Sequence, residues 1–179
     1  MPIRFEFTGR KVILTGAAGD IGSRILEGFL GAGARVFATD RPGERLDALS
    51  GSADQLKKAG CDLTDVDDIR QTMRGALEWL GGCDVLLNVA GYMPIRETLG
   101  LTEKDWSDVL GVNLLAPYFA IQETIEALKA SPSGRIISFS SIAGKMGGIG
   151  PNIHYSAAKA GLLAITFNLA RELAKTGIT

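Results

Sequence analysis

The chain alternates short runs of β-branched and aliphatic residues with longer segments of helical periodicity. Buried parallel strands are continuous apolar runs, and each needs a helical connection to the next. The alternation therefore predicts an α/β protein whose parallel sheet is covered by helices on both faces. The expected strands are Lys11–Thr15, Arg35–Thr39, a weaker run that ends near Cys61, Asp84–Asn88 and Arg135–Ser140.

Helices are expected wherever apolar residues recur every three or four positions. The segment Asp65–Trp79 shows this spacing most clearly, and stretches 41–53 and 144–151 are rich in turn residues. A length of 179 residues is the size of one domain, so we expect a single domain over residues 1–179. The expected helices are Ile21–Ala32, Asp65–Trp79, Glu103–Lys129 and Tyr155–Lys175.

Charge and cysteine content restrict the classes of partner. The 19 basic and 20 acidic residues are mixed along the chain, so no basic surface for nucleic acid or membrane is predicted. Cys61 and Cys83 lack the spacing of metal ligands and are too few for a disulfide framework, so no metal is expected. We interpret them as small buried residues rather than chemical groups. With no signal peptide or long apolar span visible, a small-molecule partner and a cytoplasmic location are expected.

Residues 15–22 read TGAAGDIG and connect the first expected strand to the first expected helix. Glycines at such a junction permit a tight turn, close approach of a pyrophosphate to the main chain, and close packing of helix on strand. The N-terminus of the helix adds free N–H donors and a partial positive charge. Gly16, Gly19 and Gly22 therefore predict a dinucleotide site, although any one of them alone would indicate only a tight turn.

Asp40 follows the second expected strand, eighteen residues after Gly22. A carboxylate there can accept hydrogen bonds from the hydroxyl groups of an adenosine ribose. The same charge would repel a 2′-phosphate, and neither Gly19 nor Asp20 supplies a base, so NAD is favoured over NADP. Arg41 leaves the alternative open, because a guanidinium beside the strand end can pair with a phosphate.

Tyr155 and Lys159 lie four residues apart at the start of the last expected helix and so project from one face. Oxidising an alcohol requires removal of its hydroxyl proton, and an ordinary phenol with a pKa of about 10 is a poor base near neutrality. An ammonium about 4 Å away favours the ionised phenol by roughly 4 kcal/mol. The pair alone is weak evidence, since a surface pair has the same spacing.

Ser141 strengthens the catalytic interpretation, because it follows the fifth expected strand and ligands bind outside the carboxyl ends of such strands. A serine hydroxyl can donate to the substrate oxygen and polarise a carbonyl. Ser138 and Ser140 are alternatives, but Ser138 is expected within the strand and Ser140 on the opposite side from Ser141.

With these motifs in order, the sequence resembles the short-chain dehydrogenase/reductases over nearly its whole length. The resemblance implies a Rossmann-type doubly wound sheet, here with five strands in the order 3-2-1-4-5. The motifs that carry it are residues 15–22, Asp62-Leu63, Asn88-Val89-Ala90-Gly91, Asn113, residues 134–144 and Tyr155-Ser156-Ala157-Ala158-Lys159.

The resemblance also implies roles for individual residues. Asp62 would contact adenine, Asn113 would hold a water that relays protons to Lys159, and Lys159 would bind the nicotinamide ribose. Read without the resemblance, Asn88 is a strand-end cap and Asn113 a buried polar group that needs partners. The implied catalytic residues are Asn113, Ser141, Tyr155 and Lys159. The implied cofactor residues are Gly16, Gly19, Asp20, Ile21, Gly22, Asp40, Arg41, Asp62, Leu63, Asn88, Ala90, Gly91, Tyr155 and Lys159.

Two features depart from the family pattern. Asp20 occupies the position of the middle glycine, and the spacing of Gly16, Gly19 and Gly22 resembles the extended, sugar-nucleotide branch. The regions around Asn88 and Ser141 instead resemble the single-domain branch, including 3-oxoacyl-carrier-protein reductases and sugar dehydrogenases. We expect Asp20 to turn outward, which the helix dipole permits.

The second departure is at the C-terminal end. Family members usually continue with a sixth strand, a Pro-Gly segment, a substrate lid and a seventh strand, so the resemblance implies a shortened chain. The strand Ile136–Ser140 is then expected to expose one edge. His154, next to Tyr155, is expected to touch the substrate or to lie at the rim of its pocket.

The resulting prediction is an oxidoreductase that transfers hydride between NAD(H) and a secondary alcohol or ketone. The alternative is a nucleotide-binding fragment or sensor without turnover. By the resemblance, the chain is expected to form a homodimer or homotetramer. Ala116, Phe119, Leu163 and Phe167 are the residues expected to supply its apolar faces, although burial within one chain explains them equally well.

Overall fold

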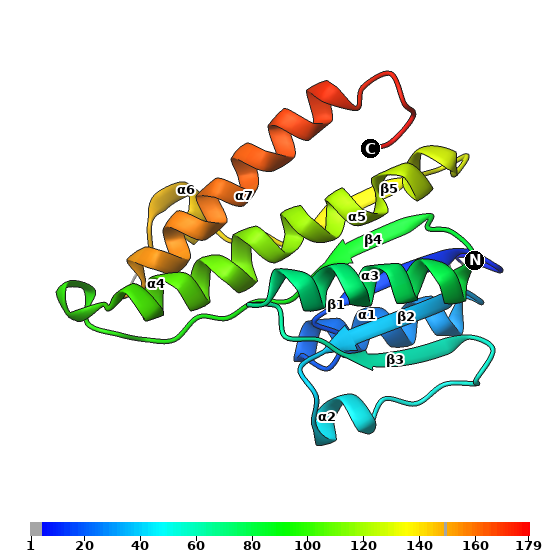
Figure 1. The fold of residues 1–179 in the computed structure, drawn as a ribbon, viewed down its shortest axis with the longest axis horizontal. Helices are drawn as coiled ribbons and strands as arrows, with labels where there is room; N and C mark the ends of the chain where they lie inside the picture. Colours follow the sequence, from blue (N-terminus) through cyan, green and yellow to red (C-terminus); the bar gives the residue numbers. More distant parts are fainter. Residues whose placement is uncertain (1–4, 149) are drawn as a thin grey trace.

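Five parallel strands form the sheet in the computed structural model, which describes residues 5–148 and 150–179. Their order is β3-β2-β1-β4-β5, as predicted, and every neighbouring pair is parallel. The expected fold class is therefore confirmed (Figure 1). The strands are β1 (Lys11–Thr15), β2 (Arg35–Asp40), β3 (Leu56–Gly60), β4 (Val85–Asn88) and β5 (Arg135–Ser138).

Helices cover both faces of this sheet, with α1 behind it and α3 and α5 in front (Figure 1). Successive side chains of a strand point to opposite faces. Ile13 and Leu86 accordingly pack in one core cluster with α3 and α5, whereas Val12, Leu14 and Leu87 pack in the other with α1. The helical elements are α1 (Asp20–Gly31), α2 (Glu44–Asp47), α3 (Val66–Leu80), η1 (Thr98–Gly100), α4 (Glu103–Leu110), η2 (Gly111–Leu115), α5 (Ala116–Ala130), α6 (Ala143–Met146) and α7 (Ile153–Glu172).

The long helix expected over Glu103–Lys129 is divided by a π-helical turn, η2, between α4 and α5. π turns inside helices often mark functional positions, and this one contains Asn113. Two short helices that the sequence did not predict, α2 and α6, lie in the linker-like stretches. The last helix begins at Ile153, two residues earlier than expected.

The outer edge of β5 is partly paired. The N–H of Ile136 donates to the carbonyl of Thr179 at 2.9 Å, and the N–H of Thr179 donates to the carbonyl of Gly134 at 3.3 Å. The expectation of an exposed edge is therefore wrong at this end of the strand. Ile137 still exposes 43% of its surface.

Both cysteines are buried and unbridged, as expected for small core residues. Desolvation raises the pKa of the Cys61 thiol to about 11 and that of Cys83 to about 12, so both stay protonated near neutrality. Within the described ranges, no group of three or more potential metal-ligating side chains occurs. None of the described helices has the length and apolar character needed to cross a bilayer.

Candidate functional site

The predicted site residues gather at the carboxyl ends of the strands. Thr15, Asp40 and Asn88 are the last residues of β1, β2 and β4, and Ser141 follows β5 by three positions. Because all strands are parallel, these ends form a single edge of the sheet. Ligands of open α/β sheets bind at this edge.

The glycine loop packs against the main chain that follows β4. Gly16 has a φ of +71°, and a Cβ there would lie 2.5 Å from the Cα and N atoms of Ala90. A Cβ on Gly22 would overlap the carbonyl oxygen of Gly16. Both glycines are therefore required for the close approach of the loop, the β4 end and helix α1.

The start of α1 offers free hydrogen-bond donors. Within the described part of the chain, the main-chain N–H groups of Asp20, Ile21 and Gly22 have no acceptor. The next donor, the N–H of Ser23, bonds to the carbonyl of Gly19 at 2.9 Å. Three unpaired donors at the positive end of a helix are an arrangement that can bind an anion.

Asp40 lies directly beside this loop. One carboxylate oxygen accepts from the N–H of Ala18 at 2.9 Å, and the other accepts from the N–H of Arg41 at 2.8 Å. Each oxygen keeps a further lone pair, so ribose hydroxyls can still donate to it. The Arg41 residue is exposed next to this carboxylate.

Asp20 turns outward, as predicted, with 94% of its side chain exposed. Its carboxylate pairs with the guanidinium of Arg45 from α2 at 2.6 Å. Arg45 could not be predicted from the sequence, because no local pattern indicates that α2 returns to the glycine loop.

Asp62 and Leu63 follow β3, and they differ in which of their groups could contact an adenine. The N–H and hydroxyl of Thr64 donate to Asp62 at 2.9 and 2.7 Å and hold the pKa of its carboxyl below the ordinary value. The side chain of Leu63 is buried in the core, so only its main chain can face a ligand.

Asn88 and Asn113 are both buried. The Asn88 amide donates to the Ser138 hydroxyl at 3.2 Å, while its Oδ1 atom has no partner within the described residues. The Asn113 amide donates to the carbonyls of Tyr92 at 2.7 Å and Val109 at 2.9 Å, and its oxygen accepts from the N–H of Tyr92 at 3.3 Å. The prediction that Asn113 is a buried group with polar partners is confirmed, and these bonds tie the loop after β4 to the π turn.

Lys159 and Tyr155 are brought together on α7, where the ammonium lies 5.6 Å from the centroid of the phenol ring. The ammonium donates to the carbonyl of Phe139, just beyond β5, at 2.7 Å. Burial lowers the pKa of Lys159 to about 8. From the sequence this lysine was expected to be an ordinary cation, whereas burial in the structure gives it a lowered pKa.

This low pKa makes the stability of the protein depend on pH. Because the ordinary value is 10.5, the unfolded chain holds more protons between about pH 8 and pH 10.5, and the free energy of unfolding rises with pH there. A Lys159→Met variant has no charge to bury. Between about pH 7 and about pH 10, we expect the free energy of unfolding of the native chain to rise by about 2 kcal/mol relative to that of Lys159→Met.

Urea unfolding of both proteins at the two pH values measures this change. Lys145→Met, at an exposed position on α6, is the control and should show a difference that does not depend on pH. A constant difference for Lys159→Met would contradict the lowered pKa.

Ser141 is the serine beyond the end of β5 whose hydroxyl hydrogen has no acceptor within the described residues. Ser138 accepts from Asn88, and the Ser140 hydroxyl donates to the main-chain carbonyl of Lys159 at 2.9 Å. Among the described residues, the N–H of Ala143 donates to the Ser141 hydroxyl at 3.2 Å, and no other partner of this hydroxyl is present there. Ser141 also lines a small cavity of about 320 Å³ with Ser140, Ile142, Lys145 and Leu163.

His154 differs from both predictions made for it. The ring is fully buried and packs edge-on against Trp106, with 6.1 Å between the ring centroids. Neither ring nitrogen has a partner within the described residues. His154 therefore lies neither against a substrate nor at a pocket rim.

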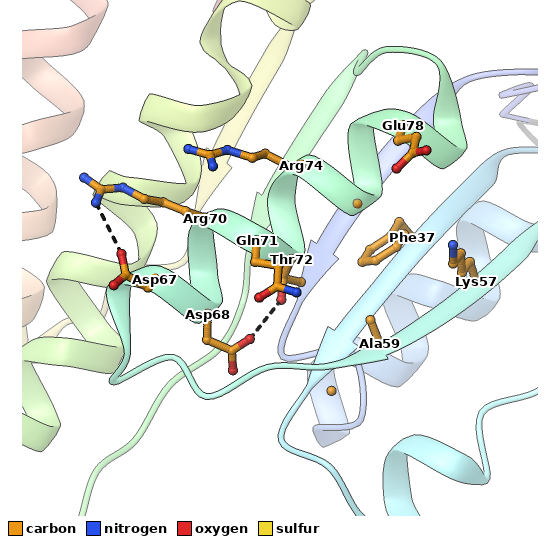
Figure 2. A pocket seen from close by; sticks show the side chains of 12 residues that line it. Phe37, Lys57, Ala59, Asp67, Asp68, Arg70, Gln71, Thr72, Arg74 and Glu78 are labelled. Carbon is orange, nitrogen blue, oxygen red and sulfur yellow. Dashed lines mark hydrogen bonds and ion pairs between the residues drawn. The ribbon is translucent and has the colours of Figure 1, made fainter.

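A wider cavity of about 910 Å³ lies between α3 and the strands β2 and β3 (Figure 2). Acidic and basic side chains of α3 surround it, with Arg70 paired to Asp67 at 3.6 Å and the Thr72 hydroxyl 3.5 Å from Asp68. No predicted site residue lines this cavity. The wider cavity and the predicted site residues therefore lie in different places.

Comparison with known proteins agrees with this geometry. A family model described as short chain dehydrogenase matches residues 10–179. The chain is 35% identical to nodulation protein G of Rhizobium meliloti (strain 1021) over 176 residues, which cover 98% of this chain and 71% of that protein. The chain is 32% identical to the 3-oxoacyl-[acyl-carrier-protein] reductase of Escherichia coli (strain K12), and the match covers 97% of this chain and 71% of that protein.

Solved structures show the same likeness. A metagenomic short-chain oxidoreductase in complex with NADP superposes with a TM-score of 0.89 at 32% identity, over 96% of this chain and 79% of that one. A short-chain dehydrogenase/reductase of Brucella melitensis, described as glucose/ribitol dehydrogenase, superposes with a TM-score of 0.88 at 32% identity. The match covers 96% of this chain and 73% of that one.

Proposed function

The chain belongs to the short-chain dehydrogenase family, and from this premise we propose that it transfers hydride between NAD(H) and a secondary alcohol or ketone. The observation that carries the proposal is the buried ammonium of Lys159 above the Tyr155 ring, at the sheet edge where Ser141 offers a free hydroxyl hydrogen. A phenol and a lysine in this arrangement suit proton transfer to and from an alcohol oxygen.

A nicotinamide dinucleotide fits the residues at this edge. The free N–H groups of Asp20, Ile21 and Gly22 suit its pyrophosphate, and the carboxylate of Asp40 suits its adenosine ribose. The unpartnered Oδ1 of Asn88 is a buried acceptor at the same edge. When bound, the cofactor supplies the site that accepts or donates hydride.

The residues of the chain handle the proton. The Lys159 cation favours the phenolate form of Tyr155. This phenolate takes the hydroxyl proton of an alcohol and becomes the neutral phenol. Ser141 donates to the substrate oxygen and holds it against the phenol. Asn113 is proposed to hold a water that relays protons to Lys159, and its bonds to Tyr92 keep the loop after β4 in place.

NAD is the proposed cofactor because Asp40 holds a negative charge at the position proposed for the adenosine ribose. A 2′-phosphate at that position would be repelled. The complex of the metagenomic relative with NADP is a property of that protein. Arg41, exposed next to Asp40, is the residue through which NADP could be accepted.

Replacing Asp40 with alanine is expected to weaken NADH binding by about tenfold, because charge-assisted hydrogen bonds to the ribose are lost. The preference for NADH over NADPH should narrow at the same time. Fluorescence titration with both cofactors measures the two constants. Asp40→Asn is the matched control, which removes the charge but keeps an oxygen for the Ala18 N–H. Equal affinities for both cofactors before and after the change would contradict the assignment.

Turnover separates the proposal from its alternative, a nucleotide-binding module without chemistry. Titration with NADH and NADPH is followed by a screen of secondary alcohols and ketones, with absorbance at the reduced nicotinamide band as the signal. Cofactor binding with substrate-dependent turnover supports the enzyme. Binding without turnover on every class supports the module.

A homodimer or homotetramer and a cytoplasmic location complete the proposal. Of the four residues expected on the apolar faces, Ala116 is buried within the chain and Phe119 and Leu163 are half-buried, whereas Phe167 on α7 exposes 62% of its surface. Tyr118 on α5 is 40% exposed. The oligomer is therefore proposed to form through the outer faces of α5 and α7, and the buried thiols suit a reducing compartment.

A further inference from the structure

Asp20 places a negative charge where the proposed cofactor is most negative. It is the first residue of α1, and its own N–H is one of the three free donors proposed for the pyrophosphate. A carboxylate at a helix N-terminus is favourable in the absence of a ligand, but it competes with an incoming anion for the same partial charge. Without compensation, Asp20 would weaken dinucleotide binding.

Arg45 provides the compensating charge. Its guanidinium lies 2.6 Å from the Asp20 carboxylate, although α2 is separated from the glycine loop by all of β2. The position of α2 is fixed by neighbours other than Asp20. Leu46 is buried, and the Lys58 ammonium of β3 donates to the carbonyls of Asp47 at 2.7 Å and Leu49 at 3.0 Å. The guanidinium is therefore held near Asp20 by the fold itself.

We propose that Arg45 is a positioning residue for the cofactor, which acts by neutralising Asp20 and so keeps the N-terminus of α1 receptive to a pyrophosphate. This inference rests on the proposed function. The Asp20–Arg45 pair takes over the role of an uncharged residue at the middle position of the loop. Arg45 is assigned no direct contact with the cofactor.

The Arg45→Gln variant is expected to bind NADH about three- to fivefold more weakly than the native chain at low ionic strength. This factor corresponds to the interaction energy of one exposed ion pair. Asp20→Asn is expected to bind NADH at least as tightly as the native chain. Adding Arg45→Gln to Asp20→Asn should then change the affinity little, because no charge remains to neutralise. Arg45→Lys keeps the charge and should restore most of the affinity.

Isothermal titration with NADH on all five proteins, at low and at high salt, measures this cycle. The effect of Arg45→Gln should diminish at high salt, because both side chains are exposed. Arg24→Gln is the matched control, since Arg24 pairs with Glu27 at 2.9 Å on the same helix and away from the loop. Thermal unfolding midpoints check that every variant is folded.

If Arg45→Gln weakens NADH binding equally in the native chain and in Asp20→Asn, Arg45 binds the cofactor directly and the inference is overturned. No loss in the native background, or a larger loss in Asp20→Asn, would overturn it as well. These outcomes leave the proposed function intact, because the native chain still binds NADH. If the folded native chain binds neither NADH nor NADPH, the proposed function fails and the inference fails with it.

Discussion

Replacing Tyr155 with phenylalanine is expected to lower kcat by two to four orders of magnitude, about the contribution of a positioned acid or base. The change removes only the hydroxyl that exchanges a proton with the substrate. The ring that lies under the Lys159 ammonium remains, so the geometry of α7 is preserved. Binding of NADH should therefore change little, and the loss should fall on turnover rather than on cofactor affinity.

Steady-state kinetics on the best substrate of the screen, with NADH binding measured in parallel, test this expectation. Tyr118→Phe is the matched control, because Tyr118 is a half-exposed phenol on α5 that packs edge-on against Phe119, and a phenylalanine keeps that contact. The control should keep the native kcat. Equal turnover by Tyr155→Phe and the native chain would exclude Tyr155 from proton transfer.

The architecture could be predicted because local patterns determine it. Strands β1 and β2 are apolar on both faces, as buried parallel strands must be, and the glycine loop between β1 and α1 has main-chain requirements that few residues meet. Once the strands are predicted, their carboxyl ends are known as well. Asp40, Asn88 and Ser141 can therefore be placed at one edge of the sheet. Periodicity could not reveal the π turn at Asn113, because its residues keep a helical pattern on either side.

The errors come from burial and from contacts distant in sequence. His154 was placed at the site because it precedes Tyr155, but adjacent residues of a helix face different directions. The helix therefore directs His154 towards Trp106 and into the interior. The lowered pKa of Lys159 and the pairing of Arg45 with Asp20 depend on which segments pack together, which no local pattern shows.

Replacing Gly22 with alanine is expected to lower the free energy of unfolding by about 2–4 kcal/mol and to abolish measurable NADH binding. Gly22 is buried in the first turn of α1, and an added Cβ would overlap the carbonyl oxygen of Gly16. Neither atom can rotate away, because the oxygen belongs to the main chain and the main chain fixes the position of the Cβ. Helix and loop must separate, and the three free N–H groups lose their common direction.

Gly28→Ala on the same helix is the control that isolates this effect. A Cβ on Gly28 would have no atom within 4 Å, and alanine favours a helix over glycine. We therefore expect Gly28→Ala to raise the free energy of unfolding by about 0.5–1 kcal/mol and to leave NADH binding unchanged. Urea unfolding and NADH titration of both variants measure the contrast. Native stability and native binding in Gly22→Ala would show that the close contact of Gly22 with the loop is not what holds the proposed pyrophosphate site together.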